Sequence, residues 1–300
     1  SENNLFLLLG VLGLADELYG HSLLPVGTVY DPFVCRALDA FTYATYSQAK
    51  FIVVGTPSGI SLSAEGGAHQ SIITPGIGVQ LPGVTYYEPA FALELEWILL
   101  AALAGLQDRQ KGKSAYLRLS TRPIEQELFN TVLAQRTEEA LRGEVLKGGY
   151  RLVDCRQEEG YRPGDNVVHL FVSGALVPEA VDAARQLRTH HIFANVFNVT
   201  SADLLFHSHV AAQQEALGGK AGCSWVEELV PAHERVAPVL TIHDAHPHTL
   251  SFIGGVLSTR MMNLGVTEFG QSGSRTELYQ RYGLATEHIV EAAKWLVGKR

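Results

Sequence analysis

Short apolar runs alternate with helical stretches along most of this sequence, and this alternation limits the fold more than any other feature. The runs that we expect to form strands are 23–30, 51–54, 84–87, 114–119, 167–173, 192–199, 236–243 and 264–269. The expected helices are 5–18, 31–47, 89–103, 178–188, 249–257, 274–282 and 287–297, with another beginning at 201. Strand–helix alternation predicts an α/β fold with two doubly wound, mostly parallel sheets.

Three positions are predicted in more detail. We expect 23–30 to be a central strand, because it is extended and largely apolar. Asp31 should cap the helix that follows, with Pro32 at its first position. Pro89 should likewise open the helix 89–103.

The sequence divides near its middle. The stretch 121–146 is charged and helical and lacks strong core periodicity, so it is typical of a connector. We therefore expect a first domain over 1–122, a linker over 123–149 and a second domain over 150–300. A length of 300 residues is typical of two domains.

Composition excludes several classes of protein. The net charge is −8 and there is no long basic run, which argues against nucleic acid or an anionic membrane as partner. The run 5–14 is too short to span a bilayer and lacks the basic flank of a signal peptide. Cys35, Cys155 and Cys223 lie far apart, which argues against a disulfide framework or a structural zinc site. We expect a cytoplasmic protein.

A glycine-rich loop, 55–71, follows the expected strand 51–54 and contains Glu65 and His69. Such a loop after a strand is where α/β enzymes place their chemistry. His69 is the best candidate for general acid–base catalysis, because imidazole titrates near neutral pH. Glu65 could polarise His69 or act separately. The alternative is a surface loop with two solvated polar side chains.

Three further residues are candidates for binding. Tyr30 and Phe33 flank a strand-to-helix turn, where open α/β sheets bind ligands, and an aromatic ring there could stack on a flat heterocycle. Core packing is the alternative for both. The Glu2 carboxylate lies at the start of an apolar helix, where the helix dipole favours it. By position alone it is an ordinary N-terminal acidic residue.

No metal site is predicted within the chain. Glu65 and His69 lack a third ligand in their loop. His243, Asp244, His246 and His248 follow a strand, but they form a compact cluster without a distant partner, so we favour a loop at the carboxyl edge of a sheet, at an interface. There is also no GxGxxG opening a helix, no P-loop, and no Gly-Asp-Gly followed by a spaced asparagine.

Several stretches resemble one enzyme superfamily, in the same order along the chain. Residues 63–71 resemble the Glu-Asp-Gly-Pro-Thr-His-Gln-Pro loop of transketolases, and residues 270–283 resemble a motif of their C-terminal domain. Residues 86–92, 199–201 and 269–275 resemble the homodimeric first component of pyruvate dehydrogenase, a thiamine-dependent decarboxylase. The resemblance implies a transketolase-like pyrimidine-binding domain, incomplete at its start, followed by a transketolase C-terminal domain.

The resemblance also implies roles for the candidate residues. Glu2 would hydrogen-bond the aminopyrimidine ring of thiamine diphosphate and promote loss of the proton from the C2 atom of the cofactor. Phe33 would stack on that ring, and Tyr30 would lie toward the substrate. His69 would handle protons of bound intermediates, with Glu65 beside it.

The implied function is part of a thiamine diphosphate-dependent 2-oxoacid (pyruvate) dehydrogenase. It would decarboxylate the 2-oxoacid and acylate a lipoyl group on a partner acyltransferase, as a homodimer joined by the apolar helices 5–18 and 93–103. The domain that binds the diphosphate and Mg²⁺ is absent from this sequence, so the isolated chain should be inactive. The alternatives are transketolase-type ketol transfer, although Arg36 is the only basic candidate near the loop for a sugar phosphate, and a non-catalytic dimerisation or regulatory module.

Overall fold

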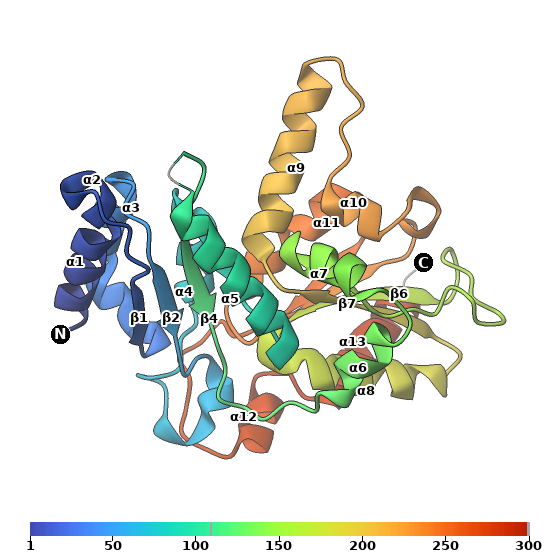
Figure 1. Cartoon of the computed structure of the whole chain (residues 1–300). Coiled ribbons are helices and arrows are strands. Elements are labelled where there is room, and N and C mark those ends of the chain that lie inside the picture. Colours follow the sequence, from blue (N-terminus) through green and yellow to red (C-terminus); the bar gives the residue numbers. More distant parts are fainter. Residues whose placement is uncertain (109, 299–300) are drawn as a thin grey trace.

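Two β-sheets lie side by side in the computed structural model, which describes residues 1–108 and 110–298 (Figure 1). The first sheet has the order β1-β2-β4-β3 and is entirely parallel; its strands are β1 (Val26–Val29), β2 (Ile52–Gly55), β3 (Val84–Tyr87) and β4 (Ser114–Arg118). The second has the order β5-β7-β6-β8-β9; its strands are β5 (Gly149–Val153), β6 (Val167–Ser173), β7 (Phe193–Val199), β8 (Val239–Ile242) and β9 (Met261–Leu264). Only β5 pairs antiparallel among the strands described. The predicted fold class is confirmed.

Helices cover both faces of the first sheet. The sheet and these helices together form the N-terminal domain. On the outer face α1 (Glu2–Gly13) packs against α3 (Leu38–Tyr46), where Phe6 and Phe41 are fully buried with ring centroids 4.9 Å apart. On the inner face lies α5 (Ala92–Gln107) (Figure 1). The short helices α2 (Ala15–Tyr19) and α4 (Thr74–Gln80) complete the domain.

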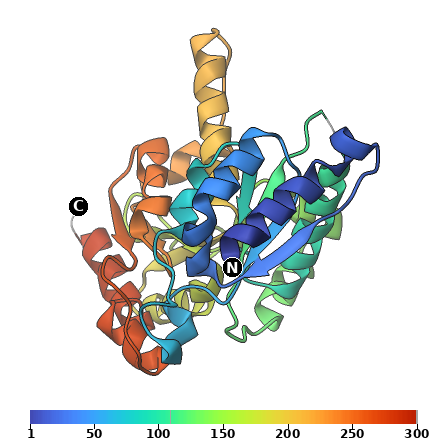
Figure 2. The same cartoon turned by 90° about the vertical axis from the view of Figure 1, so that its left-hand side faces the viewer.

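The second sheet and its helices form the C-terminal domain. Helices α8 (Val177–Arg188) and α13 (Thr286–Gly298) pack together on one face, while α9 (Ala202–Leu217), α10 (Trp225–Leu229) and α11 (Phe252–Leu257) pack on the other. Helix α12 (Arg275–Arg281) lies against the loop that follows β2. Helix α9 projects from the body of the molecule (Figures 1 and 2).

The expected connector forms two helices, α6 (Glu127–Leu133) and α7 (Glu138–Leu146). Each buries apolar side chains despite its weak periodicity, including Phe129 in α6 and Leu141 in α7. These side chains belong to one apolar core that runs from Ile52 of the first sheet to the second sheet. The two domains are therefore packed against each other through a shared core.

Several local predictions are wrong, for identifiable reasons. Strand β1 is an edge strand and not a central one, since only β2 pairs with it. Asp31 does not cap a helix, because its side chain is buried in ionic contacts described below. Helix α5 begins at Ala92, beyond Pro89, since the Glu94 carboxylate accepts hydrogen bonds from the Ala90 and Phe91 amides and fixes the start there.

The last expected strand also begins earlier than predicted, as β9, and α4 was not predicted at all. No helix among residues 1–108 and 110–298 is long and apolar enough to cross a membrane.

Candidate active site

Two of the predicted aromatic residues and the predicted histidine lie in one cluster. Tyr30 lies between the end of β1 and a 3₁₀ helix, η1 (Asp31–Ala37), which contains Phe33. Their rings stack with centroids 5.8 Å apart. The His69 imidazole meets both rings edge-on, with its centroid 5.9 Å from Tyr30 and 5.5 Å from Phe33. The structure thus brings together side chains that are 36 to 39 positions apart in the sequence.

The fourth predicted residue, Glu2, reaches this cluster through Arg36. The Arg36 guanidinium lies 3.9 Å from the centroid of the Phe33 ring, and its Nη1 donates to Glu2 Oε1 at 3.4 Å. Guanidinium is a flat cation with N–H donors that can stack on an aromatic ring. The place between Phe33 and Glu2 therefore accepts a flat, positively charged group that carries N–H donors.

His69 has an unused nitrogen. Its backbone N–H donates to Gly66 O at 3.1 Å, which closes the turn that presents the ring. The ring Nδ1 is buried and has no hydrogen-bond partner among the described residues. A buried imidazole nitrogen without a partner costs free energy unless a ligand satisfies it. Its position is therefore suited to exchanging a proton with a bound molecule.

Glu65 does not join this cluster. It ends the 3₁₀ helix η2 (Ile60–Glu65), is exposed, and makes no hydrogen bond or ion pair with a residue that the structure describes. The predicted contact between Glu65 and His69 is therefore not formed in this conformation.

A cavity of about 630 Å³ adjoins the His69 loop. Cys35 of η1 and the loop residues on either side of His69, 67–68 and 70–74, form one side of it, and His246, Thr267 and Phe269 of the C-terminal domain form the other. The cavity lies between the two domains, so both contribute to its shape.

A buried ionic network lies beneath the loop, centred on Arg118 at the end of β4. Its Nε donates to Asp31 Oδ2 at 3.0 Å, and its Nη1 donates to Glu88 Oε1 at 2.5 Å. Tyr116 donates a very short hydrogen bond to Asp31, and Thr74 donates to the same carboxylate at 2.5 Å. All five side chains are essentially inaccessible to solvent. The network accounts for the burial of Asp31, which the sequence suggested was a helix cap.

Glu88 connects this network to the C-terminal domain. Its Oε2 accepts a hydrogen bond from Tyr86 at 2.7 Å and lies 2.8 Å from His243 Nε2. Burial alone would raise the pKa of Glu88, but the positive charges of Arg118 and His243 and the hydrogen bonds from His243 and Tyr86 lower it to about 2. Glu88 is therefore a carboxylate at any ordinary pH.

The histidine cluster after β8 is divided between separate contacts. His243 faces Glu88, and Asp244 hydrogen-bonds the backbone of η2. The His246 amide donates to Ile72 O at 3.0 Å, while His248 is exposed. The described residues hold no group of three or more His, Cys, Asp or Glu side chains that could bind a metal ion. The cluster lies at the junction of the two domains.

Sequence reasoning missed Arg118, Glu88 and the contacts of Asp244. The sequence contains one indication that Arg118 is buried in an ion pair, since it is a charged residue inside the apolar strand run 114–119. An arginine there is buried only if carboxylates pair with it. Its partners lie 87 and 30 positions away and could not be identified from spacing.

The low pKa of Glu88 predicts acid sensitivity. A carboxyl with a pKa of about 4.5 when unfolded and about 2 when folded stabilises the protein above pH 4.5 and loses that contribution as the pH falls toward 2. The difference corresponds to about 3 kcal/mol. We expect urea unfolding at pH 6, 4 and 3 to show that the stability gap between wild type and Glu88→Gln narrows as pH falls. A gap that stays constant would contradict the assignment.

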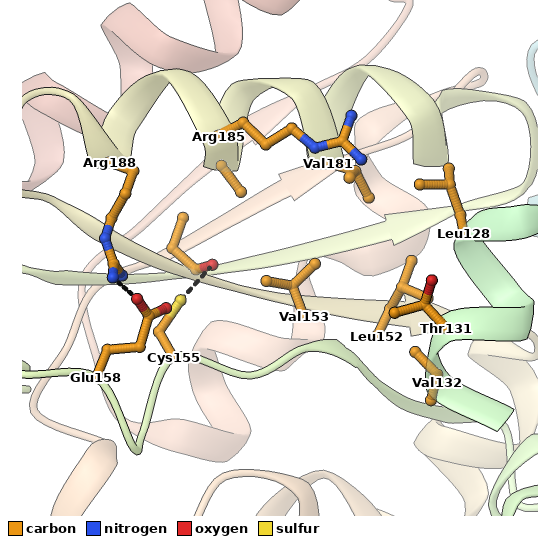
Figure 3. A pocket seen from close by; sticks show the side chains of 12 residues that line it. Leu128, Thr131, Val132, Leu152, Val153, Cys155, Glu158, Val181, Arg185 and Arg188 are labelled. Atoms are coloured by element: carbon orange, nitrogen blue, oxygen red, sulfur yellow. Dashed lines mark hydrogen bonds and ion pairs between the residues drawn. The ribbon is translucent and has the colours of Figure 1, made fainter. Parts of the chain in front are cut away.

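A second cavity, of about 290 Å³, lies between helix α6 and the C-terminal domain (Figure 3). Its walls are mainly apolar, and Arg188 at its rim is ion-paired with Glu158. The Cys155 thiol contacts Ala194 O at 3.5 Å, and burial raises the pKa of this thiol to about 11. The lining comes from α6, β5 and the segment after it, α8 and β7, and includes no residue of the His69 loop, so this cavity is separate from the candidate active site.

Comparison with known proteins agrees with the fold described above. The profile of the transketolase-like C-terminal domain matches residues 148–285. A solved structure described as a split gene transketolase, an inactive β4 tetramer, superposes with a TM-score of 0.71 at 21% identity. The match covers 100% of this chain and 83% of the chain in that structure. The fold is that of the C-terminal portion of transketolases. A transketolase from Campylobacter jejuni superposes with a TM-score of 0.68 at 18% identity, covering 91% of this chain and 36% of its own.

Curated relatives are transketolases as well. The chromosomal transketolase of Cupriavidus necator is 25% identical over 298 residues, covering 95% of this chain and 37% of the relative. Transketolase 1 of Escherichia coli K12 is 26% identical over 289 residues, covering 96% and 38%. The chain thus spans little more than a third of the length of these relatives. The resemblance to the pyruvate dehydrogenase first component finds no support in them, and the transketolase alternative is the better supported one.

Proposed function

We propose that this chain forms the pyrimidine-binding half of the active site of a transketolase-type, thiamine diphosphate-dependent enzyme. The observation that carries the proposal is the convergence of Glu2, Phe33, Tyr30 and His69 from three separate segments. These are the residues that the family resemblance assigns to the cofactor ring and to proton transfer. The role of each remains part of the proposal.

The residues present fit an aminopyrimidine ring. The Arg36 guanidinium occupies the place between Phe33 and Glu2, and a protonated aminopyrimidine shares its flatness, charge and N–H donors. Arg36 is largely exposed, so it can leave this place for solvent. Phe33 would then stack on the ring, and Glu2 would accept a hydrogen bond from it. Thiamine diphosphate, when bound, supplies a thiazolium that acts as an electron sink next to a substrate carbonyl.

This chain's residues would orient the ring and handle protons. Glu2 would hold a proton shared with the ring, at the start of α1, where the helix dipole favours its charge. His69 would exchange a proton with substrate at its unpaired Nδ1. Tyr30 and Phe33 would exclude water from one side of the imidazole. No residue here is proposed to bind Mg²⁺ or the diphosphate, which a complementary chain or segment would hold.

Ketol transfer is the first candidate for the reaction, because the named relatives are transketolases. Decarboxylation of a 2-oxoacid such as pyruvate, followed by acylation of a lipoyl group on a partner acyltransferase, is the second. The basic side chain beside the cluster, Arg36, pairs with Glu2 and stacks on Phe33 in this conformation, but a bound ring would displace and free it, so Arg36 does not decide between the two candidates. A sugar phosphate would need a cation that is free to bind it.

We propose that the chain also associates with itself. Helix α1 exposes Leu7, Leu8 and Val11, each by more than half of its surface, which is unusual for a solvated helix. Helix α5 was also expected to contribute, but Leu93, Leu99 and Leu103 pack against the core and only Leu100 of that stretch is strongly exposed. The proposed assembly is a dimer. We place it in the cytoplasm, because three unpaired cysteines suit a reducing compartment.

Cofactor binding tests the function. We expect calorimetry with thiamine diphosphate and Mg²⁺ to show weak binding to this chain alone. Tight binding and activity should appear when the chain is combined with a polypeptide that carries Gly-Asp-Gly…Asn, the motif of a diphosphate and Mg²⁺ site in the resembled family. Activity is then measured with a ketose phosphate plus an aldose phosphate, and with pyruvate plus an artificial electron acceptor. If the combined protein binds no thiamine diphosphate, the proposal is wrong.

A further inference from the structure

The loop that carries His69 is fixed chiefly by residues of the other domain. Asp244 of the C-terminal domain is the second residue after the end of β8 and is almost fully buried. Its Oδ1 accepts a hydrogen bond from Ile60 N at 2.9 Å, and its Oδ2 accepts one from Ser61 N at 3.1 Å. Asp244 thus caps the first turn of η2 from 183 and 184 positions away.

The loop has no cap of its own. Gly59 stands at the N-cap position of η2, where a side-chain acceptor would normally lie, and it has none. Its φ of +66° favours glycine, and a Cβ at this position would overlap the Asp244 carboxylate. The backbone therefore turns in a way that admits Asp244, which replaces the missing local cap.

Arg118 joins the end of the loop to Asp244. Its Nη2 donates to Asp244 O at 2.9 Å and to Ser71 O and Oγ at 3.3 and 3.2 Å. Ser71 Oγ in turn accepts from Gly59 N at 3.1 Å. The start and end of the segment 59–71 are therefore joined to each other and to Asp244.

A second contact from the C-terminal domain lies next to His69 itself. Gln70 Nε2 donates to Ser63 O at 2.9 Å and to Gln271 O at 3.0 Å. Gly67 lies so close to the Gly270 carbonyl that a Cβ there would overlap it. The turn that presents His69 is thus packed directly against the segment 270–271.

We propose that Asp244 is a positioning residue for His69. By capping η2 it sets the path of the loop 59–71, and through that path it keeps the His69 ring against Tyr30 and Phe33. The C-terminal domain then contributes to the active site without touching substrate or cofactor. The consequence for catalysis rests on the proposed function, whereas the positioning itself does not.

Amide hydrogen exchange tests the positioning on the chain without cofactor. Asp244→Ala removes both acceptors, and we expect exchange at Ile60 and Ser61 to become about 10- to 100-fold faster, as for the loss of hydrogen bonds to a charged group. Asp244→Asn keeps the side-chain volume and one acceptor, so it should give an intermediate effect. Because it preserves packing, it also provides the readout if the alanine variant does not fold.

The matched control is Thr241→Val. Thr241 is equally buried on β8, but its hydroxyl donates to Asn263 Oδ1 at 2.8 Å, inside the C-terminal domain. This variant should weaken the domain without changing exchange in the loop. A second readout is the NMR signal of the His69 ring, assigned with His69→Gln. In the Asp244 variants it should lose the ring-current shift from Tyr30 and Phe33, and in Thr241→Val it should keep it.

Two failures can be told apart. If the Asp244 variants match Thr241→Val in loop exchange and in the His69 signal, the positioning role is wrong whatever the enzyme does. If the combined wild-type protein shows no thiamine-dependent activity, the proposed function is wrong while the positioning role stands. If both hold, Asp244→Asn should lower kcat about 10-fold or more and leave the KM for thiamine diphosphate unchanged.

Discussion

Replacing Arg118 with methionine should destabilise the protein by about 3–5 kcal/mol, the usual cost of leaving buried charges without their partner. Arg118 is 1% exposed and bonds to the carboxylates of Asp31 and Glu88. Methionine fills a similar volume, so the loss reports mainly on charge and hydrogen bonding. Guanidinium unfolding followed by circular dichroism, at pH 7 and moderate salt, measures the change.

Two further variants make this measurement specific. Arg185→Met removes an exposed ion pair with Asp182, in which both side chains are more than half exposed, and should cost less than about 1 kcal/mol. Adding Glu88→Gln to Arg118→Met removes one of the stranded carboxylates, so the double variant should be more stable than additivity predicts. An Arg118→Met protein within 1 kcal/mol of wild type would show that the network does not hold the domains together.

The network also shows how far the sequence could be interpreted. Strands such as β2, β6 and β7 were predicted because each is an apolar run of the right length. Such a run indicates a buried strand without information from any other part of the sequence. Tyr30, Phe33 and His69 were found because their residue types suit a ligand at a strand end. Their mutual contact was not predicted by spacing and came only from a family resemblance.

The missed residues share a different property, since their meaning depends on distant partners. Asp31 followed by proline is a good local helix cap, but Arg118 reaches it across the ends of neighbouring parallel strands. Asp244 belongs to a histidine-rich stretch that was interpreted as a loop at the carboxyl edge of a sheet, and its partners Ile60 and Ser61 lie in the other domain. Such contacts are fixed by how the two sheets pack, which a single sequence does not record.

The glycine-rich loop shows the same division between local and distant information. Its glycines marked it as a turn region, and this is what the structure shows at Gly59 and Gly66, both with positive φ. A loop of this kind is commonly mobile without ligand. Here Asp244 and Gln271 of the C-terminal domain accept hydrogen bonds from it, and Arg118 donates both to Ser71 of the loop and to Asp244. The loop that carries His69 therefore depends on contacts with the C-terminal domain, in which none of the predicted site residues lies.

His69→Gln should lower kcat of the combined enzyme by about 10²- to 10⁴-fold, the usual contribution of a general acid–base group. Glutamine keeps a hydrogen-bonding side chain of similar reach but exchanges no proton at neutral pH. The KM for thiamine diphosphate should change little, because Phe33 and Glu2, rather than His69, are proposed to hold the ring. Steady-state kinetics across pH 6 to 9 provides both constants and shows whether an ionisation is lost.

Glu65→Gln is the matched control, because it lies in the same loop and was predicted from the same sequence pattern. In the structure Glu65 is exposed and has no contact with His69, so its substitution should change kcat by less than about threefold. Equal losses in the two variants would mean that the loop rearranges when the cofactor binds and that Glu65 then reaches His69. A large loss in Glu65→Gln alone would transfer the proton-handling role from the imidazole to the carboxylate, and the assignment of His69 would be wrong.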